Sequence, residues 1–197
     1  MNELLSKNLY LVKQHLGMFK AANNFDIYCP ETSDLIMTCR EDKLGFLTKI
    51  FRFTNFKMMT PFHVEIKDRN NQLVLSMKRK STFWGFTPIM IFDENNSPIG
   101  LLQRKFRIGG AKIELTDLSK NNLGTLQGNL IGWDFKITNN NTELARITKK
   151  WAGIGKELFT TADNYILVIN DVVNPNEPIR KLMLSAVLCI DFLLKNK

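Results

Sequence analysis

Basic residues recur in this 197-residue chain where short alternating segments end. The clusters are Lys78-Arg79-Lys80, Arg104-Lys105 with Arg107, Lys149-Lys150, Lys156 and Arg180-Lys181. Arginine binds phosphate groups in bidentate geometry, and lysine binds them as a point charge. Several of the clusters lie near aromatic residues, which favour the headgroup level of a membrane, at Phe83, Trp84, Phe86 and Trp151. The chemistry that this pattern could support is anion binding at an interface.

The sequence offers little that could catalyse a reaction. His15 and His63 are the only histidines, and neither stands in an HExxH or HxH setting. The segment 153–156 resembles a phosphate loop, but Lys150 stands where that motif needs glycine and Glu157 where it needs serine or threonine. We therefore predict a non-enzymatic protein without a cofactor.

The overall charge is positive, with 27 Lys+Arg against 19 Asp+Glu and a formal net charge of +8. A surplus of this size favours anionic partners such as nucleic acid, phospholipid headgroups or acidic proteins. The alternative is that the charge only keeps the protein in solution. Charge alone does not separate these two interpretations.

The three cysteines, Cys29, Cys39 and Cys189, show no CxxC spacing. An odd and sparse set argues against a disulfide scaffold and against a zinc site, and reduced thiols are expected in a reducing compartment. The N-terminal residues lack a basic stretch followed by an apolar one, so no secretory signal is indicated. We expect a cytoplasmic protein, and one place where it could act is the inner face of the membrane.

Four segments share one plan: a short alternating strand, a polar turn rich in Asp and Asn, and a second strand. They cover residues 63–80, 89–106, 112–128 and 134–150, and the turns open at Asp68, Asp93, Asp117 and Asn139. Asp and Asn side chains bond their own backbone and tolerate left-handed conformations, so each unit predicts a β-hairpin. A looser copy over 25–38 and further strands at 9–12, 45–53 and 165–169 bring the total to about a dozen strands.

Alternation within these units indicates one buried face and one solvated face. In one segment Ile113 and Leu115 alternate with polar residues, and in another Trp133, Phe135 and Ile137 do so. The chain therefore reads as a mostly antiparallel all-β protein.

A single strong helix pattern covers residues 179–195, with Pro178 just ahead of it. From Leu182 to Leu194 every residue is apolar except Ser185 and Asp191, and a helix that is apolar on all faces must be buried. A bilayer span needs about 20 apolar residues, so no transmembrane helix is expected. The residues predicted to form the core of the helix are Leu182, Leu184, Val187, Leu188, Ile190 and Leu194.

The number of strands and the apolar C-terminal helix point to the same architecture. Side chains alone fill a barrel of about eight strands, and a wider barrel needs something else inside it. A central helix is one such solution. We therefore predict one domain over residues 1–197: a closed, mostly antiparallel barrel of about 12 strands, a count subject to single-sequence error, around the C-terminal helix.

Two segments near the C-terminus resemble the phospholipid scramblases. Ala162-Asp163-Asn164-Tyr165 resembles the Ala-Asp-Asn-Phe stretch of that family, and residues 181–194 resemble its final apolar helix with Ile-Asp-Phe. Residues 11–14 resemble the opening strand, and residues 149–160 are similar to bacterial scramblase-related proteins. The resemblance covers about residues 8–194. It implies the tubby-like fold shared with plant LURP-one-related proteins: a closed barrel around a C-terminal helix.

The resemblance also carries functional expectations. Animal members are linked to calcium-dependent lipid scrambling, and tubby domains bind phosphoinositides through basic side chains. This chain lacks the Pro-rich N-terminal region and cysteine clusters of the animal proteins, and it offers only Asp163, Asp171 and Glu177 in the calcium segment. Calcium takes six to eight oxygen ligands, so Asp163 and Asp171 are weak candidates for metal ligands.

The resulting hypothesis is a barrel that binds anionic phospholipid headgroups at the membrane surface without catalysis, in preference to true scrambling. The basic residues assigned to this contact are Arg79, Lys80, Arg104, Lys105, Lys149 and Lys150. Three alternatives remain: solvated strand ends with core aromatics, a nucleic-acid-binding rim, and a protein scaffold.

Overall fold

Twelve antiparallel strands form one closed barrel in the computed structural model, which describes residues 3–14, 24–41, 60–81, 87–105, 111–129, 132–149 and 164–194. The side chains of residues 62, 111 and 191–194 are outside this description. The elements are η1 (Glu3–Leu5), β1 (Leu9–Gln14), β2 (Phe25–Cys29), β3 (Asp34–Glu41), β4 (Phe62–Asp68), β5 (Leu73–Arg79), β6 (Ile89–Asp93), β7 (Pro98–Lys105), β8 (Ala111–Thr116), β9 (Asn122–Asn129), β10 (Asp134–Asn139), β11 (Thr142–Thr148), β12 (Asn164–Ile169) and α2 (Ile179–Leu194).

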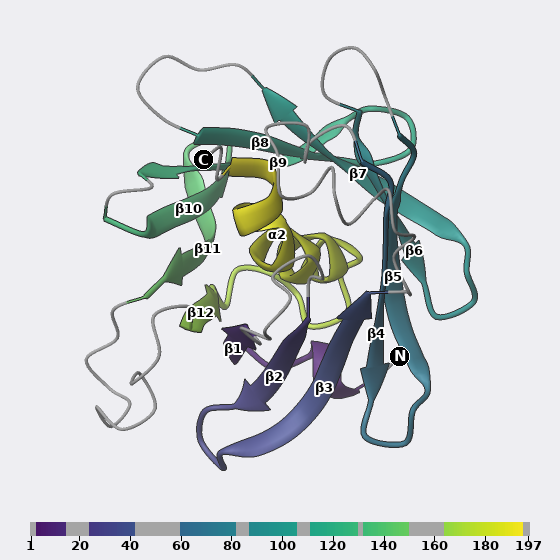
Figure 1. Cartoon of the computed structure of the whole chain (residues 1–197). Coiled ribbons are helices and arrows are strands. Elements are labelled where there is room, and N and C mark those ends of the chain that lie inside the picture. Colours follow the sequence, from purple (N-terminus) through teal and green to yellow (C-terminus); the bar gives the residue numbers. More distant parts are fainter. Residues whose placement is uncertain are drawn as a thin grey trace.

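The strands follow one another around the barrel in chain order, and β1 closes it by pairing with β12. Figure 1 shows the strands arranged around α2, drawn in yellow. The predicted architecture is therefore confirmed: a closed antiparallel barrel with a C-terminal helix inside. The expected strand over 45–53 lies outside the described residues.

The predicted hairpin turns use the same local chemistry three times. The Oδ1 atom of Asp68 accepts hydrogen bonds from the backbone N–H of Asn70 at 2.8 Å and of Gln72 at 2.9 Å. Asp93 makes the same pair of contacts in its turn, and the Oδ1 atom of Asp117 accepts from the N–H of Asn121 at 2.8 Å. An Asp at the end of the first strand therefore closes each of these turns.

Each hairpin also carries a register shift close to the turn, with the extra residue in its second strand. A residue with a left-handed backbone lies in the turn, with φ between 46° and 67°, at Ser33, Asn71, Asn96, Lys120, Asn140 and Asn141. Such shifts increase the local twist of a strand pair, and barrel closure requires twist. The sequence marked the turns, but the accompanying bulges carried no separate signal.

Helix α2 fills the barrel. The side chains of Leu182, Leu184, Val187, Leu188 and Ile190 are each at most 1 % exposed, which confirms these predicted core residues. Leu194 belongs to the helix, but its side chain is outside the description. The inner faces of the strands supply the rest of the core, and the predicted pair Ile113 and Leu115 is fully buried there.

Glycine lets the helix approach the barrel wall closely at one point. A Cβ atom added to Gly100 would lie 2.5 Å from the carbonyl oxygen of Thr116 and 3.1 Å from the side chain of Leu182. Gly100 therefore lies between a neighbouring strand and the helix, where no larger residue fits without a shift.

The three cysteines are free and buried. Cys29 lies opposite Asp34 and Cys39 lies opposite Phe25, so the two thiols do not face each other across the β2–β3 hairpin. Burial raises the pKa of the Cys39 and Cys189 thiols well above the usual range. Both thiols therefore stay protonated at neutral pH and act as core residues.

The antiparallel order gives the barrel two different ends. The turn end holds the hairpin turns of β2–β3, β4–β5, β6–β7, β8–β9 and β10–β11 together with the start of α2. The loop end is the opposite end, where β1, β3, β5, β7, β9 and β11 finish and where α2 ends.

Candidate functional site

Basic residues predicted to bind anions meet at the loop end. Strands β5, β7 and β11 run in the same direction because neighbours alternate around an antiparallel barrel. These strands therefore finish at the same end of the molecule. The basic residues at or next to their last positions are Arg79, Lys80, Arg104, Lys105 and Lys149. Lys150 is outside the described residues. We call the six residues Arg79, Lys80, Arg104, Lys105, Lys149 and Lys150 the basic rim.

Arg79 is the one described member of the basic rim that is buried, with 4 % exposure. Its Nη2 atom donates a hydrogen bond of 2.6 Å to the carbonyl oxygen of Thr60. Burial raises the pKa of the Cys189 thiol, and the charge of Arg79 opposes that rise. Arg79 therefore directs its charge into the barrel, toward the helix, and does not form part of the exposed surface.

Arg104 and Lys105 differ in their surroundings although they are adjacent. Arg104 lies opposite the fully buried Ile113, and desolvation lowers the pKa of its guanidinium. Lys105 lies opposite Lys112, and their Nζ atoms lie 3.3 and 3.2 Å from the carboxylate of Glu114. Partial burial opposes ionisation of Glu114, but the bonds from the two lysines lower its pKa. Two cations sharing one carboxylate leave a local positive surplus.

Lys149 lies on aromatic rings. Its Nζ atom is 4.0 Å from the ring centroid of Trp133 and 5.1 Å from that of Tyr165. The Trp133 ring is tilted against Tyr165 at 5.5 Å and meets Phe135 edge-on at 6.1 Å. Lys149 therefore makes cation–π contacts with two aromatic rings at the loop end.

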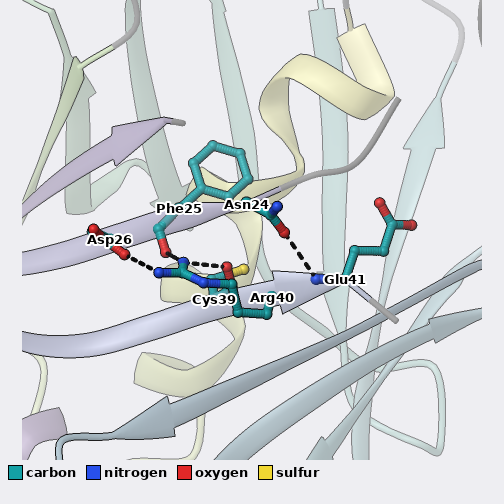
Figure 2. Close-up of polar contacts among 6 residues, drawn as sticks. All are labelled: Asn24, Phe25, Asp26, Cys39, Arg40 and Glu41. Carbon is teal, nitrogen blue, oxygen red and sulfur yellow. Dashed lines mark hydrogen bonds and ion pairs between the residues drawn. The ribbon is translucent and has the colours of Figure 1, made fainter. Parts of the chain in front are cut away.

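The structure adds a loop-end cation that the sequence did not single out. Figure 2 shows Arg40 of β3 reaching across to β2. Its Nη1 atom donates to the carbonyl oxygens of Phe25 at 2.6 Å and Cys39 at 2.9 Å, and its Nη2 atom donates to Asp26 at 2.6 Å. The carboxylate of Asp26 offsets the charge of Arg40. This residue therefore fastens two strands where they reach the loop end.

The last predicted cluster, Arg180 and Lys181, lies at the opposite end of the barrel. This pair lies apart from the other clusters because the helix starts at the turn end. Arg180 is 1 % exposed. It donates hydrogen bonds of 2.6 to 3.0 Å to the carbonyl oxygens of Leu5, Ser6, Lys7 and Val173 and to Oδ1 of Asn8.

The acidic residues of the calcium segment do not gather in the described structure. Asp163 is outside the described residues. Asp171 is exposed and accepts a 2.5 Å hydrogen bond from Nδ2 of Asn8, while Glu177 accepts from the backbone of Asn174 at 3.3 Å. Within the described ranges, no group of three or more His, Cys, Asp or Glu residues could hold a metal ion.

None of the aromatic residues expected beside the basic clusters belongs to the described part of the chain. Phe83, Trp84, Phe86 and Trp151 are outside the described residues. Trp133, which alternation had assigned to a strand, lies instead in the turn before β10, with a left-handed φ of 48°. Gly132 stands directly before it in the same turn.

Comparison with known proteins agrees with this architecture. The family model described as Scramblase matches residues 4–195, almost the whole chain.

The chain belongs to the scramblase family.

A phospholipid scramblase family protein of Schizosaccharomyces pombe is 23 % identical over 196 residues, which cover 88 % of this chain and 51 % of the yeast protein. This scramblase-family chain thus spans about half the length of the curated relative that it matches. An Arabidopsis thaliana protein of known X-ray structure shares the fold at 10 % identity, with a TM-score of 0.57 over 98 % of this chain and 97 % of that one. Among the described residues of this family member, no helix has the length and apolar character needed to cross a membrane.

Proposed function

We propose that this scramblase-family barrel binds anionic phospholipid headgroups at the membrane surface, without catalysis, and that the loop end faces the membrane. In this proposal the protein acts at the cytoplasmic face of the membrane, and its fold likeness extends to the tubby-like and LURP-one-related barrels. The observation that carries the proposal is the meeting of three basic strand ends, from β5, β7 and β11, at one end of the barrel.

The contacts of these residues support a positive surface. Lys80 is exposed, Lys105 and Lys112 share one carboxylate, and the ammonium of Lys149 lies on neutral rings. A basic residue near an anionic membrane contributes about 1 kcal/mol. By the same rule Lys80, Lys105, Lys112 and Lys149 together would contribute about 4 kcal/mol to membrane binding, which suits reversible peripheral binding. Arg79 is buried, so we assign it to the interior of the loop end and not to the headgroup contact.

Flotation with vesicles tests the proposal. The rim variant changes Lys80, Arg104, Lys105 and Lys149 to Gln, and a matched variant changes four basic residues at or near the turn end to Gln: Lys7, Lys67, Arg69 and Lys120. Both lose the same net charge. We expect the wild type and the matched variant to float with anionic vesicles at about 0.15 M salt, where the Debye length is about 8 Å, and the rim variant to stay unbound.

Other outcomes would overturn the proposal. Equal loss of flotation in both variants would show that only total charge matters and that the loop end is not the contact. Flotation with neutral vesicles would show that charge does not drive binding. Failure of the wild type to float would remove the lipid hypothesis, and salt-sensitive retention of a single-stranded oligonucleotide would then favour the nucleic-acid alternative.

A further inference from the structure

One exposed apolar side chain lies on the outer wall of the barrel near the loop end. Met90 is 36 % exposed and stands between Ile89 and Ile91, which are both fully buried, so its side chain points outward from β6. It is the second residue of a strand that begins at the loop end. The other large apolar residues that are exposed in the described part of the chain, Leu118 and Val172, lie in turns at the turn end.

Met90 belongs to a small apolar patch on the outer wall. Leu101 of β7 lies opposite Met90, and Phe92 follows two residues later on β6; both are partly buried. Single exposed apolar residues are ordinary on protein surfaces, but neighbouring ones mark interaction sites. The outward positions of β8, β9 and β10 differ, since they carry Lys112, Glu114, Thr125, Gln127, Asp134 and Lys136.

Two lysines of β5 border the patch on one side. Lys78 lies opposite Met90, and its Nζ atom is 4.7 Å from the ring centroid of Phe92. The same ammonium donates a 2.9 Å hydrogen bond to Oδ1 of Asn96. Lys80 follows directly after the end of the strand and is exposed. Both printed partners of the Lys78 ammonium are uncharged groups, so they leave its positive charge uncompensated.

The carboxylates on the adjacent strands have lysine partners of their own. On β4, Glu65 accepts a 2.8 Å ion pair from Lys67, and the charge of Lys78 acts on it only in addition. On the other side of the patch, Lys105 and Lys112 share the carboxylate of Glu114. The outer wall around the patch therefore keeps a surplus of positive charge.

We infer that the barrel rests on an anionic bilayer in a tilted orientation, with the outer wall of β5–β8 next to the loop end against the lipid. Met90 then lies between the headgroups, and the bordering lysines, Lys78, Lys80, Lys105 and Lys112, contact the phosphates. The partner fits because a bilayer interface offers anionic groups directly above apolar chains. The flexible methionine side chain adapts to such a surface. The inference rests on the proposed function and adds the side of the barrel that makes the contact.

A fluorophore at position 90 tests this orientation in the whole chain. The three native thiols are buried, so a maleimide fluorophore that brightens in apolar surroundings labels the new surface thiol of Met90→Cys, and wild type labelled in parallel gives the background. We expect its emission to rise several-fold and to shift to shorter wavelength with vesicles of phosphatidylserine and phosphatidylcholine. With phosphatidylcholine alone we expect no change.

A matched label on another side of the barrel controls for contact by the whole loop end. Lys136 is exposed on β10, which begins at the loop end as β6 does but lies four strands farther around the barrel. The label on Lys136→Cys should change little when the protein binds the same vesicles. Equal rises at positions 90 and 136 would show that the barrel is not tilted and would overturn the inference.

An unlabelled variant tests whether the patch contributes to binding. Met90→Gln keeps the side-chain length at an outward position, so we expect an unchanged melting temperature and a several-fold lower recovery with anionic vesicles. Leu118→Gln, at the turn end, should float like the wild type. A Met90→Gln protein that floats like the wild type, or a label at position 90 that stays unchanged while the protein floats, would overturn the inference and leave the proposed function standing. Absence of flotation in the wild type would overturn both.

Discussion

The turn end and the loop end of the barrel place their arginines and lysines in different environments. At the turn end Arg180 is fully enclosed by five hydrogen-bond acceptors, and Lys181 forms an ion pair with Glu94. At the loop end Lys80 is exposed, Lys149 lies on rings, and Lys105 shares one carboxylate with Lys112. Arg180 and Lys181 hold the start of the helix at the turn end, whereas these three lysines lie near the surface of the loop end.

The difference follows from how the two ends are built. Short hairpin turns leave little room for variation, because Asp side chains and left-handed residues satisfy the backbone locally. Longer connections between rigid strands can carry binding residues without disturbing the core. We therefore expect substitutions at the turn end to change stability and substitutions at the loop end to change binding.

The largest expected effect is at Arg180. Arg180→Met removes the donors of five hydrogen bonds and leaves buried carbonyl oxygens unsatisfied, so we expect the free energy of unfolding to fall by about 3 kcal/mol or more. Urea unfolding measures this change. Arg69→Met, at a side chain that is 54 % exposed, serves as the control and should change stability by at most about 1 kcal/mol. Equal losses of stability in the two variants would contradict the distinction between a buried, hydrogen-bonded arginine and an exposed one.

The second effect depends on alkaline pH and concerns Tyr10, which donates a 2.9 Å hydrogen bond to the carbonyl oxygen of Leu4. Burial raises its pKa to about 12, although the charge of Arg180 acts in the opposite direction. The unfolded chain loses this proton near pH 10 and the folded chain near pH 12, so stability is fully present below pH 10 and is lost as pH rises. Wild type should lose up to about 1.4 kcal/mol per pH unit more than Tyr10→Phe in this range. Parallel pH profiles of the two proteins would count against this role of Tyr10.

The next effect compares a glycine in the turn-end half of the barrel with a glycine at the loop end. Gly100→Ala pushes a methyl group against Thr116 and Leu182, and overpacking of this kind destabilises by about 1 to 3 kcal/mol. Gly132→Ala meets nothing within 4 Å and should leave the melting temperature nearly unchanged. A larger loss at Gly132 than at Gly100 would reverse the comparison.

A smaller effect concerns the exposed ion pair between Asp134 and Arg146, with two bonds of 2.8 and 2.6 Å. The hydrogen bond from Arg146 lowers the pKa of Asp134, so its contribution is present above the ordinary carboxyl range and is lost as pH falls through the lowered pKa. Unfolding between pH 6 and pH 2 should show that Asp134→Asn removes less than about 1 kcal/mol of this dependence, since exposed pairs contribute little.

The smallest effect per residue on stability is expected from four members of the basic rim. Changing Lys80, Arg104, Lys105 and Lys149 to Gln should alter the free energy of unfolding by about 0.5 kcal/mol or less per site, as for other surface changes. The same protein should lose vesicle binding. A large loss of stability would show that the rim, like Arg180, serves the fold.

Much of the fold could be derived from the sequence, because the signals were local. Asp68, Asp93 and Asp117 close their own turns within four residues, and the apolar run from Leu182 requires burial whatever surrounds it. Strand alternation placed Ile113 and Leu115 inside. The strand count and the need for a central helix then led to a closed barrel.

The candidate site could be derived only in part. The chain order of the strands places the ends of β5, β7 and β11 at one end of the barrel, but Arg79 and Lys80 are adjacent in the sequence and have opposite environments. Trp133 looked like a strand residue, although its backbone is left-handed. Such differences depend on which groups enclose a side chain, and no local pattern records them.

The sequence by itself determined the hairpins, the buried helix and the surplus of positive charge, because each depends on residue types a few positions apart. Only the tertiary structure decided that Arg180 faces the interior at one end while Lys149 rests on Trp133 at the other. Hydrogen bonding and burial of a charge are set by groups that the closure of the barrel brings together, as Asn8 and Arg180 show at 2.6 Å. That is why one basic residue, Arg180, is enclosed by acceptors at one end, while another, Lys149, lies on an aromatic ring at the other.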